Sequence, residues 1–259
     1  MNIKWILGLL ALIGTSILVY YCIPRSTEKQ SQNTFIVGTV SDYAPWVSTN
    51  PNGDYEGFDV DVAKAVATQM GKQLEIKDLG SMTTLFVALD QGSIDAIIWG
   101  LSITQERLDK MAMIRYQGDE VTSYPLIFWK QIPDLVKSIN DMNGMTICVE
   151  PASAQEAVLR DYPTINIQPT ERVDDALLNI QYGKANAALV EPAIANKFKQ
   201  KYPEIVSLEV PLSAQNRVYG VGIAIKQQNT SLTDSVTKAV KALIQNGTIA
   251  RYEKTWGIA

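Results

Sequence analysis

The chain is a succession of short apolar runs and amphipathic stretches. Apolar runs rich in β-branched and aromatic residues predict buried strands, and apolar residues three or four positions apart predict helices that cover a sheet. Strands are predicted at residues 35–40, 74–79, 94–99, 124–129, 146–149, 185–190 and 218–225. Helices are predicted from Gly57 onward and at residues 84–91, 154–160, 172–182, 193–202, 232–244 and 248–256. This alternation indicates an α/β protein with mainly parallel sheets.

The third predicted strand runs through a turn at Gly100 into a helix that begins at Ser102 or Thr104. Ser102 with Gln105 three residues later has the form of a capping box. A helix N-terminus after a strand presents unpaired backbone N–H groups and the positive end of the helix dipole, which together suit an anion. Arg107 can reach back over this spot and hold a carboxylate with two parallel hydrogen bonds. The alternative is an ordinary capped helix with a solvated arginine.

Residues 1–33 read as an export signal or membrane anchor followed by a tether. An apolar run at residues 5–21 precedes Cys22, and a polar stretch follows. A cleaved signal has a shorter apolar core, of about 7–15 residues, with small residues before the cut. Cys22 is placed as in a lipoprotein, although Tyr21 stands where such leaders have a small residue. A run of this length also suits an uncleaved membrane helix. The two readings stay open, and both tether an exported globular part.

Composition excludes several classes of function. The 259 residues carry a net charge of −4, with a pI of about 5.0 and no basic stripe, so we expect no nucleic-acid partner. The absence of histidine removes Ser-His-Asp and Cys-His catalysis and most zinc sites. Cys148 lies in an apolar run and is expected to be a buried small hydrophobe. We expect no metal and no cofactor.

Short motifs in a fixed order run from residue 34 to the end of the chain. They are Gly38-Thr39, Tyr43-Ala-Pro-Trp46, Gly57-Phe-Asp-Val-Asp-Val-Ala63, Ile94-Asp-Ala-Ile97, Leu101-Ser-Ile-Thr-Gln-Glu-Arg107, Ala187-Ala-Leu-Val-Glu191, Gly220-Val-Gly222, Gly247-Thr248 and Trp256. In this order the chain resembles the periplasmic solute-binding proteins of the polar amino-acid ABC transporters. This is the family 3 type, which includes arginine-, lysine-, histidine- and glutamine-binding proteins.

The resemblance implies a two-lobed periplasmic-binding-protein fold of type II, each lobe being a mainly parallel sheet flanked by helices. Lobe 1 would hold residues 34–119 and 217–259, and lobe 2 residues 120–216. Two extended crossovers, near residues 118–123 and within 208–218, would form the hinge. The ligand would lie in the cleft between the lobes, at the carboxyl ends of strands.

The resemblance also implies two charged clamps for a free amino acid. The family's carboxylate-binding arginine falls on Arg107, helped by Ser102 and the nearby backbone at Gly100. The backbone N–H of Ala154 is offered to the same carboxylate. The acid that binds the ammonium falls on Glu191, where the family usually has aspartate. The alternative for Glu191 is a surface acid that caps the helix after Pro192.

Further residues would shape the pocket. Tyr43 falls where the family stacks an aromatic ring on the ligand side chain, and Met82 and Trp99 align with positions that line the pocket. Core packing is the alternative for Tyr43 and Trp99. Val40 stands where binders of basic amino acids often have aspartate, and Glu150 could replace that acid from the opposite lobe or be a solvated loop acid.

Arginine is therefore the favoured ligand, ahead of glutamine and other polar amino acids, with the membrane subunits of an ABC permease as partners. Two rival functions share the fold. One is a dehydratase acting on prephenate-like or arogenate-like acids, in which Glu150, Glu191 or another carboxylate would be the acid catalyst. The other is a sensor domain whose N-terminal anchor signals through a partner.

Overall fold

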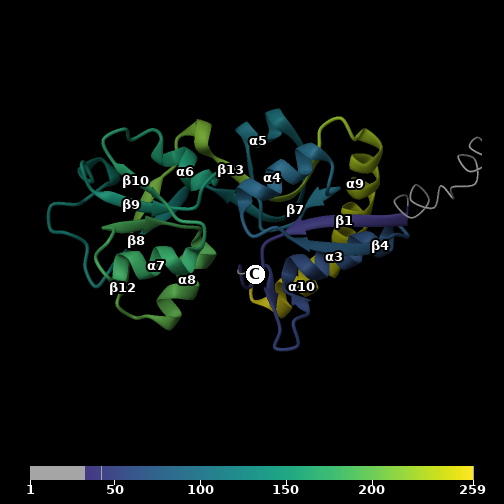
Figure 1. Ribbon diagram of the computed structural model, residues 1–259, viewed down its shortest axis with the longest axis horizontal. Coiled ribbons are helices and arrows are strands. Elements are labelled where there is room, and N and C mark those ends of the chain that lie inside the picture. Colours follow the sequence, from purple (N-terminus) through teal and green to yellow (C-terminus); the bar gives the residue numbers. More distant parts are fainter. Residues whose placement is uncertain (1–32, 42, 259) are drawn as a thin grey trace, which may run out of the picture. The chain divides into compact units, whose positions relative to one another are not determined.

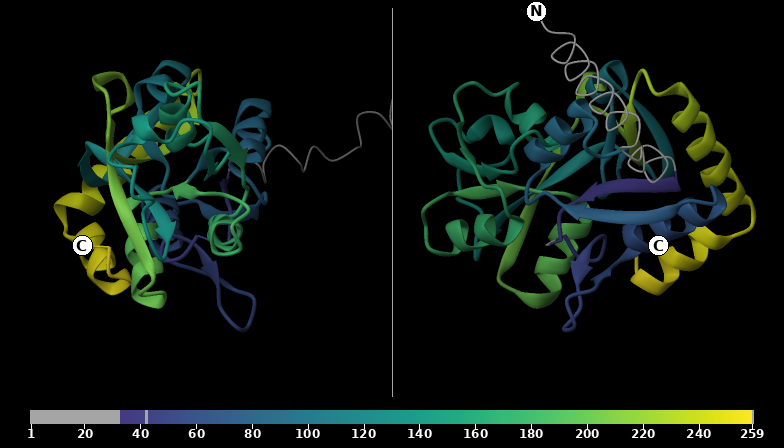
Figure 2. Two further views of the ribbon diagram at one scale, coloured as in Figure 1. Left: turned by 90° about the vertical axis from the view of Figure 1, so that its left-hand side faces the viewer. Right: turned by 45° about the vertical axis from the view of Figure 1, so that its right-hand side comes forward.

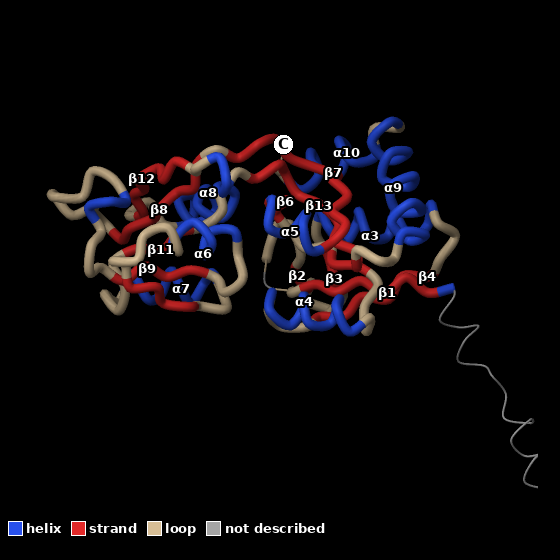
Figure 3. Tube along the Cα trace, turned by 90° about the horizontal axis from the view of Figure 1, so that it is seen from above, coloured by secondary structure: helices blue, strands red, loops and turns tan. Residues whose placement is uncertain are grey.

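The computed structural model describes residues 33–41 and 43–258, which form two large β-sheets and one two-stranded hairpin. The strands, red in Figure 3, fall into two groups with helices around each. The five-stranded sheet lies on the left of Figure 1 and the six-stranded sheet on the right. The alternation of apolar runs and amphipathic stretches thus produces the α/β architecture that the sequence predicts.

The six-stranded sheet has the order β4-β1-β5-β13-β6, and β7 also pairs with β13. Its strands are β1 (Thr34–Thr39), β4 (Gln73–Asp78), β5 (Ala96–Ile97), β6 (Ser102–Thr104), β7 (Met111–Val121) and β13 (Val218–Lys226). Strands β1 and β5 are parallel, whereas β13 is antiparallel to β5, β6 and β7. The hairpin of β2 (Ser48–Thr49) and β3 (Tyr55–Glu56) follows β1.

The helices of this half are α3 (Phe58–Gln69), α4 (Met82–Gln91), α5 (Gln105–Lys110), α9 (Thr230–Gln245) and α10 (Thr248–Trp256). Helices α9 and α10, yellow in Figure 2, pack against α3. Phe58, Val62 and Val66 follow one another at intervals of four residues on α3 and are fully buried. Burial of each such side chain contributes ~1.5–3 kcal/mol, so packing rather than intrinsic propensity holds α3 in place.

The five-stranded sheet has the order β10-β9-β11-β8-β12. Its strands are β8 (Ser123–Trp129), β9 (Thr146–Val149), β10 (Asn166–Pro169), β11 (Ala187–Leu189) and β12 (Ile205–Pro211). Strand β9 is parallel to β10 and β11, and β8 is antiparallel to β11 and β12. Its helices are α6 (Ala154–Leu159), α7 (Val173–Gln181) and α8 (Pro192–Lys201), with the short turns η1 (Ile139–Asp141) and η2 (Ala214–Asn216).

Both sheets are mixed, where the sequence predicts mainly parallel ones. The antiparallel pairs are those of β13 with β5, β6 and β7 and those of β8 with β11 and β12, and apolar runs do not reveal strand direction. Strands β7 and β12, which are mostly half-buried or exposed, were not among the predicted strands. Parts of both strands coincide with the two crossovers that the family resemblance implies. The chain does pass between the sheets at these places, from β7 to β8 and from β12 to β13.

The predicted leader and Cys22 lie outside the described residues. Within residues 33–41 and 43–258, every helix is too short or too polar to cross a membrane. Cys148 is a free thiol that is fully buried in β9, which confirms its predicted place in the core.

Candidate functional site

A small cavity is lined by residues that follow strands of both sheets. The lining residues are Tyr43, Met82, Trp99, Gly100, Leu101, Ser102, Arg107, Glu150, Ala154, Gln155 and Glu191. Every ligand-binding residue selected from the sequence is among them. Leu101 and Gln155 complete the lining and were not selected. The structure thus brings the whole predicted set together around one space.

Arg107 lies in the short helix α5 and is 7% exposed. The helix is capped by Thr104, whose hydroxyl accepts the backbone N–H of Arg107 at 3.2 Å. The guanidinium donates from Nη1 to the Ser102 carbonyl at 2.7 Å and from Nη2 to the Ala152 carbonyl at 3.1 Å. Met82 Sδ lies 3.3 Å from Nη2.

Burial lowers the pKa of Arg107, and nearby acids and Tyr124 oppose this shift. Among the residues that the structure describes, none forms a salt bridge with it. A buried guanidinium held only by neutral acceptors is free to take a carboxylate, which binds it more strongly.

Glu191 follows β11 and occupies the N-cap position of α8 without capping it through its side chain. The carboxylate turns inward instead, and its Oε1 accepts the Ser102 hydroxyl at 2.9 Å. Burial raises the pKa of Glu191, while nearby Gln155, Ser102, Arg107 and Tyr124 lower it. The alternative predicts a surface acid that caps α8, whereas the Glu191 side chain points inward and does not cap this helix.

Ser102 differs from one prediction. The predicted capping box of Ser102 and Gln105 is wrong, because Ser102 belongs to β6 and Thr104 is the cap. The Gln105 amide donates to Asp109 instead, at 2.8 Å. The Ser102 hydroxyl thus donates to Glu191 and the Ser102 carbonyl accepts from Arg107, so this one residue links the two charged groups.

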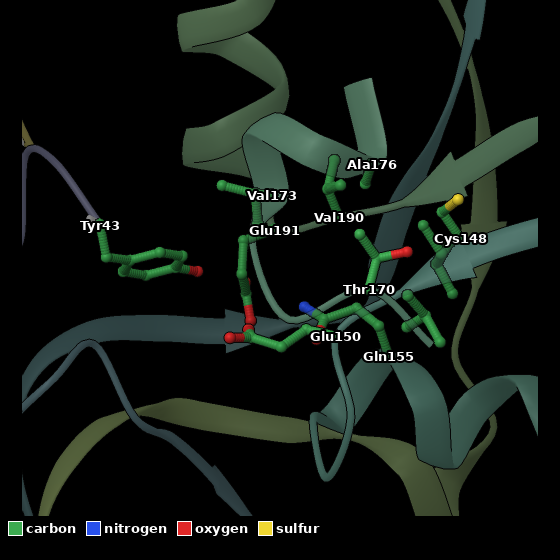
Figure 4. A pocket seen from close by; sticks show the side chains of 11 residues that line it. Tyr43, Cys148, Glu150, Gln155, Thr170, Val173, Ala176, Val190 and Glu191 are labelled. Atoms are coloured by element: carbon green, nitrogen blue, oxygen red, sulfur yellow. The ribbon is translucent and has the colours of Figure 1, made fainter. Parts of the chain in front are cut away.

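Glu150 directly follows β9 and lines the same cavity as Arg107. Burial raises its pKa to about 8, with Arg107 opposing and the acids Glu171 and Glu191 adding to the rise. A small neighbouring cavity shares Tyr43, Glu150, Gln155 and Glu191 with the first and is also lined by Thr170 and Cys148. Figure 4 shows the Tyr43 hydroxyl pointing toward the carboxyl groups of Glu150 and Glu191.

Tyr43 and Trp99 form the aromatic wall of the cavity. Their ring centroids are 5.0 Å apart and the rings are tilted by 50°. Trp99 is 3% exposed, and its indole Nε1 is buried without a hydrogen-bond partner among the described residues. Unpaired buried donors are costly and mark a place where a polar ligand can supply the missing acceptors.

Gly100 carries the turn between Trp99 and Ser102 in the left-handed region, with φ 54°. A Cβ here would lie 3.1 Å from the Trp46 ring and 3.3 Å from the Tyr43 ring. We expect Gly100→Ala to lower the free energy of unfolding by ~1–3 kcal/mol, measured by urea denaturation. Gly71→Ala is the control, because Gly71 has φ 67° and open space around it. Equal losses in the two variants would mean that only the backbone conformation matters at Gly100.

The charges of the ionisable groups that line the cavity do not balance. One guanidinium, from Arg107, stands against two carboxyl groups, from Glu150 and Glu191. With both acids ionised, the cavity has an excess negative charge in a poorly solvated space. Such a site favours a ligand that has one anionic group and more than one cationic group.

Comparisons with known proteins agree on one family. The profile of the bacterial extracellular solute-binding proteins, family 3, matches residues 35–259. A probable ABC transporter arginine-binding protein of Chlamydia trachomatis is 28% identical over 237 residues, which is 92% of this chain and 90% of that protein.

Solved structures have the same fold. A mutant of the arginine-binding protein from T. maritima superposes with a TM-score of 0.78 at 27% identity, covering 90% of this chain and 98% of that one. An ancestral amino-acid-binding protein, a precursor of cyclohexadienyl dehydratase, gives a TM-score of 0.74 at 25% identity, covering 88% and 97%. The two-lobed α/β fold predicted from the sequence is confirmed.

Proposed function

The chain belongs to the bacterial extracellular solute-binding proteins of family 3, and on that premise we propose that it is the amino-acid-binding receptor of an ABC importer, with arginine as its preferred ligand. The observation that carries the proposal is the pairing of Arg107 and Glu191 in one small cavity, reached from different sheets. A free amino acid has a carboxylate and an ammonium on one carbon, and these two side chains are its complements.

The ligand carboxylate binds Arg107 in a bidentate manner. It replaces the weaker acceptors at Nη2, the Ala152 carbonyl and the Met82 sulfur. The backbone N–H of Ala154, at the start of α6, adds to this clamp. The ligand ammonium binds Glu191 and thereby holds that carboxyl group in its ionised form.

Arginine is favoured because its side chain carries a cation that can pair with the buried carboxyl group of Glu150. Once the backbone charges of the ligand pair with Arg107 and Glu191, a neutral side chain leaves Glu150 buried either protonated or unpaired. A guanidinium on the ligand side chain neutralises it. The two relatives named as arginine-binding proteins support the same choice.

Ligand entry requires the cleft to open. The Ser102–Glu191 and Arg107–Ala152 hydrogen bonds join residues from the two halves, so the site's own groups hold the cavity shut. We assign residues 34–119 and 217–259 to lobe 1 and residues 120–216 to lobe 2. Opening is a hinge motion at the two crossings between the sheets.

Delivery requires a permease and a place at the membrane. In this proposal residues 1–33 tether the receptor outside the cytoplasm, by a lipid on Cys22 or by an uncleaved N-terminal helix. The tether keeps the ligand-loaded lobes near the membrane subunits of the transporter and so raises their effective concentration.

An enzyme on the same fold is the second candidate. It is favoured by one observation, since a carboxyl group with a pKa of about 8, that of Glu150, is protonated at neutral pH and can act as an acid. A precursor of a dehydratase has the same fold, and that precursor is itself an amino-acid-binding protein. We therefore place binding ahead of catalysis for this chain.

The proposal is tested by calorimetric titration of the full-length chain in mild detergent, after unfolding and refolding to remove carried-over ligand. The titrants are the twenty amino acids and ornithine, and prephenate and arogenate are assayed for turnover. Saturable one-to-one binding of arginine is the expected result. Turnover of either acid without amino-acid binding would favour the enzyme instead.

Glu191→Gln is expected to weaken arginine binding by roughly 10- to 100-fold while the fold survives, because Ser102 can still donate to the amide oxygen. The measurement is the dissociation constant together with the midpoint of thermal unfolding. Glu204→Gln is the control, since Glu204 is an exposed acid just beyond the same helix. An unchanged dissociation constant in Glu191→Gln would remove Glu191 from the site.

A further inference from the structure

The motif that opens helix α3 contains a buried acid that does not line the cavity. Asp59 is 1% exposed and lies in the first turn of α3. Its Oδ2 accepts the backbone N–H of Gly100, and its Oδ1 accepts the Tyr116 hydroxyl at 2.6 Å. No basic side chain among the described residues forms a salt bridge with it. Burying a carboxylate without a cation costs free energy, so stability alone does not explain why Asp59 is buried here.

One partner of Asp59 belongs to the ligand site. Gly100 lines the cavity, and two residues later the Ser102 carbonyl orients the Arg107 guanidinium at 2.7 Å. The Ser102 hydroxyl also donates to Glu191. Asp59 therefore fixes the beginning of a three-residue segment whose end holds both charged clamps.

The other partner belongs to the strand that leaves for the second sheet. Tyr116 lies on β7, next to the irregular register between β7 and β13. Its ring stacks on Phe58 at 5.9 Å, so it is fixed against α3 as well. Beyond it β7 crosses to β8 and the five-stranded sheet.

We propose that Asp59 is a positioning residue of the ligand site, which holds the segment from Gly100 to Arg107 in register with the crossover strand β7. The proposal rests on the proposed function, because the property that it predicts is affinity for an amino acid. It assigns a role to a residue that touches no ligand.

The energetics give this role a distinctive consequence. Burial raises the pKa of Asp59 from 3.8 to about 7, while its two hydrogen bonds oppose the rise. The folded state therefore holds the proton longer than the unfolded state, and the free energy of unfolding falls as the pH rises through this range. The titratable groups that face Asp59 are Tyr116 and Tyr43, and burial raises the pKa of each further above its usual range. Only Asp59 among them titrates near neutral pH.

Asp59→Asn separates positioning from stability. Asparagine removes the cost of burying a charge, so the ligand-free protein should unfold at the same or a higher temperature at pH 8. Its amide oxygen can still accept the Gly100 N–H, but without the assistance of a charge, so arginine affinity should fall by roughly 3- to 10-fold. A residue with a merely structural role cannot lose affinity while stability is kept or gained.

Asp61→Asn is the matched control. Asp61 is two residues further along α3 and accepts Trp256 Nε1 at 2.9 Å, on the side of α10. This variant should lose stability and keep the affinity of the wild type. Tyr116→Phe should resemble Asp59→Asn in affinity, because it frees Asp59 from β7.

A readout without ligand is the amide proton shift of Gly100 in NMR spectra of the full-length chain. It should titrate near pH 7 in the wild type and in Asp61→Asn but not in Asp59→Asn.

Unchanged affinity in both Asp59→Asn and Tyr116→Phe, in a chain that binds arginine, would overturn the proposal. A parallel loss of affinity and stability in Asp59→Asn would do the same. If the wild type binds no amino acid, the proposed function fails, and a Gly100 amide that is insensitive to Asp59→Asn overturns this proposal as well.

Discussion

Arg107→Ala should weaken arginine binding by roughly 30- to 5,000-fold, which corresponds to ~2–5 kcal/mol for leaving a desolvated carboxylate without its partner. The loss is large because the guanidinium is 7% exposed and is the only cation that lines the cavity among the described residues. The fold should survive, since the groups that Arg107 contacts, the Ser102 and Ala152 carbonyls and the Met82 sulfur, are uncharged. Calorimetric titration with arginine measures the effect.

Two further variants identify what Arg107 contributes. Arg107→Lys keeps the charge but loses the planar fork, so it should recover only part of the affinity. Lys110→Ala removes a cation from the same helix, where Lys110 pairs with exposed Glu106 at 2.6 Å, and should leave binding unchanged. A dissociation constant for Arg107→Ala equal to that of the wild type would mean that the carboxylate binds elsewhere.

Local patterns in the sequence predict most of the fold. Strands such as β9 and β11 are buried on both faces and stand out as apolar runs, and α7 and α9 show one apolar face each. Strands β7 and β12 are missed because most of their side chains are only partly buried, so apolar residues do not mark their full length. The antiparallel direction of β8 and β13, which apolar runs do not reveal, makes mixed sheets of those expected to be mainly parallel.

The structure brings together the candidate residues that the family resemblance selects, such as Arg107 and Glu191. Gln155 was missed because it follows Ala154 as an ordinary helical residue, and nothing in the sequence shows that its amide faces the cavity. The sequence shows Asp59 only as part of a motif that opens a helix. Its contact with Gly100, 41 residues away, arises only when α3 packs beside the turn. Long-range contacts of this kind carry no local pattern.

Glu150→Gln should weaken arginine binding by roughly 10- to 100-fold, because a neutral amide replaces the partner of the ligand guanidinium. Binding of glutamine should change little, so the selectivity for arginine over glutamine falls. Competition titrations with the two amino acids measure the ratio. Glu171→Gln is the control, since Glu171 is an exposed acid whose charge reaches Glu150 without lining the cavity. An unchanged selectivity in Glu150→Gln would place Glu150 away from the ligand side chain.

The pH dependence of binding follows from the same residue. Burial raises the pKa of Glu150 to about 8 in the ligand-free protein, so below that pH its proton must leave before the carboxylate can pair with a guanidinium. Arginine affinity should therefore rise as the pH increases from 6 to 8, by at most about tenfold per pH unit for this group, and then level off. Burial raises the pKa of Glu191 too, which adds a dependence of the same sign. Glu150→Gln should flatten the profile in part, and calorimetry in buffers of different ionisation enthalpy should show that this variant releases fewer protons on binding than the wild type.

The raised pKa of Glu150 also lowers the ligand-free protein's free energy of unfolding as the pH rises from 4.5 to about 8, so Glu150→Gln should unfold at a higher temperature than the wild type at pH 9. If the buried carboxyl group of Glu150 binds the ligand at a cost in stability, Glu150→Gln should be more stable and bind arginine more weakly.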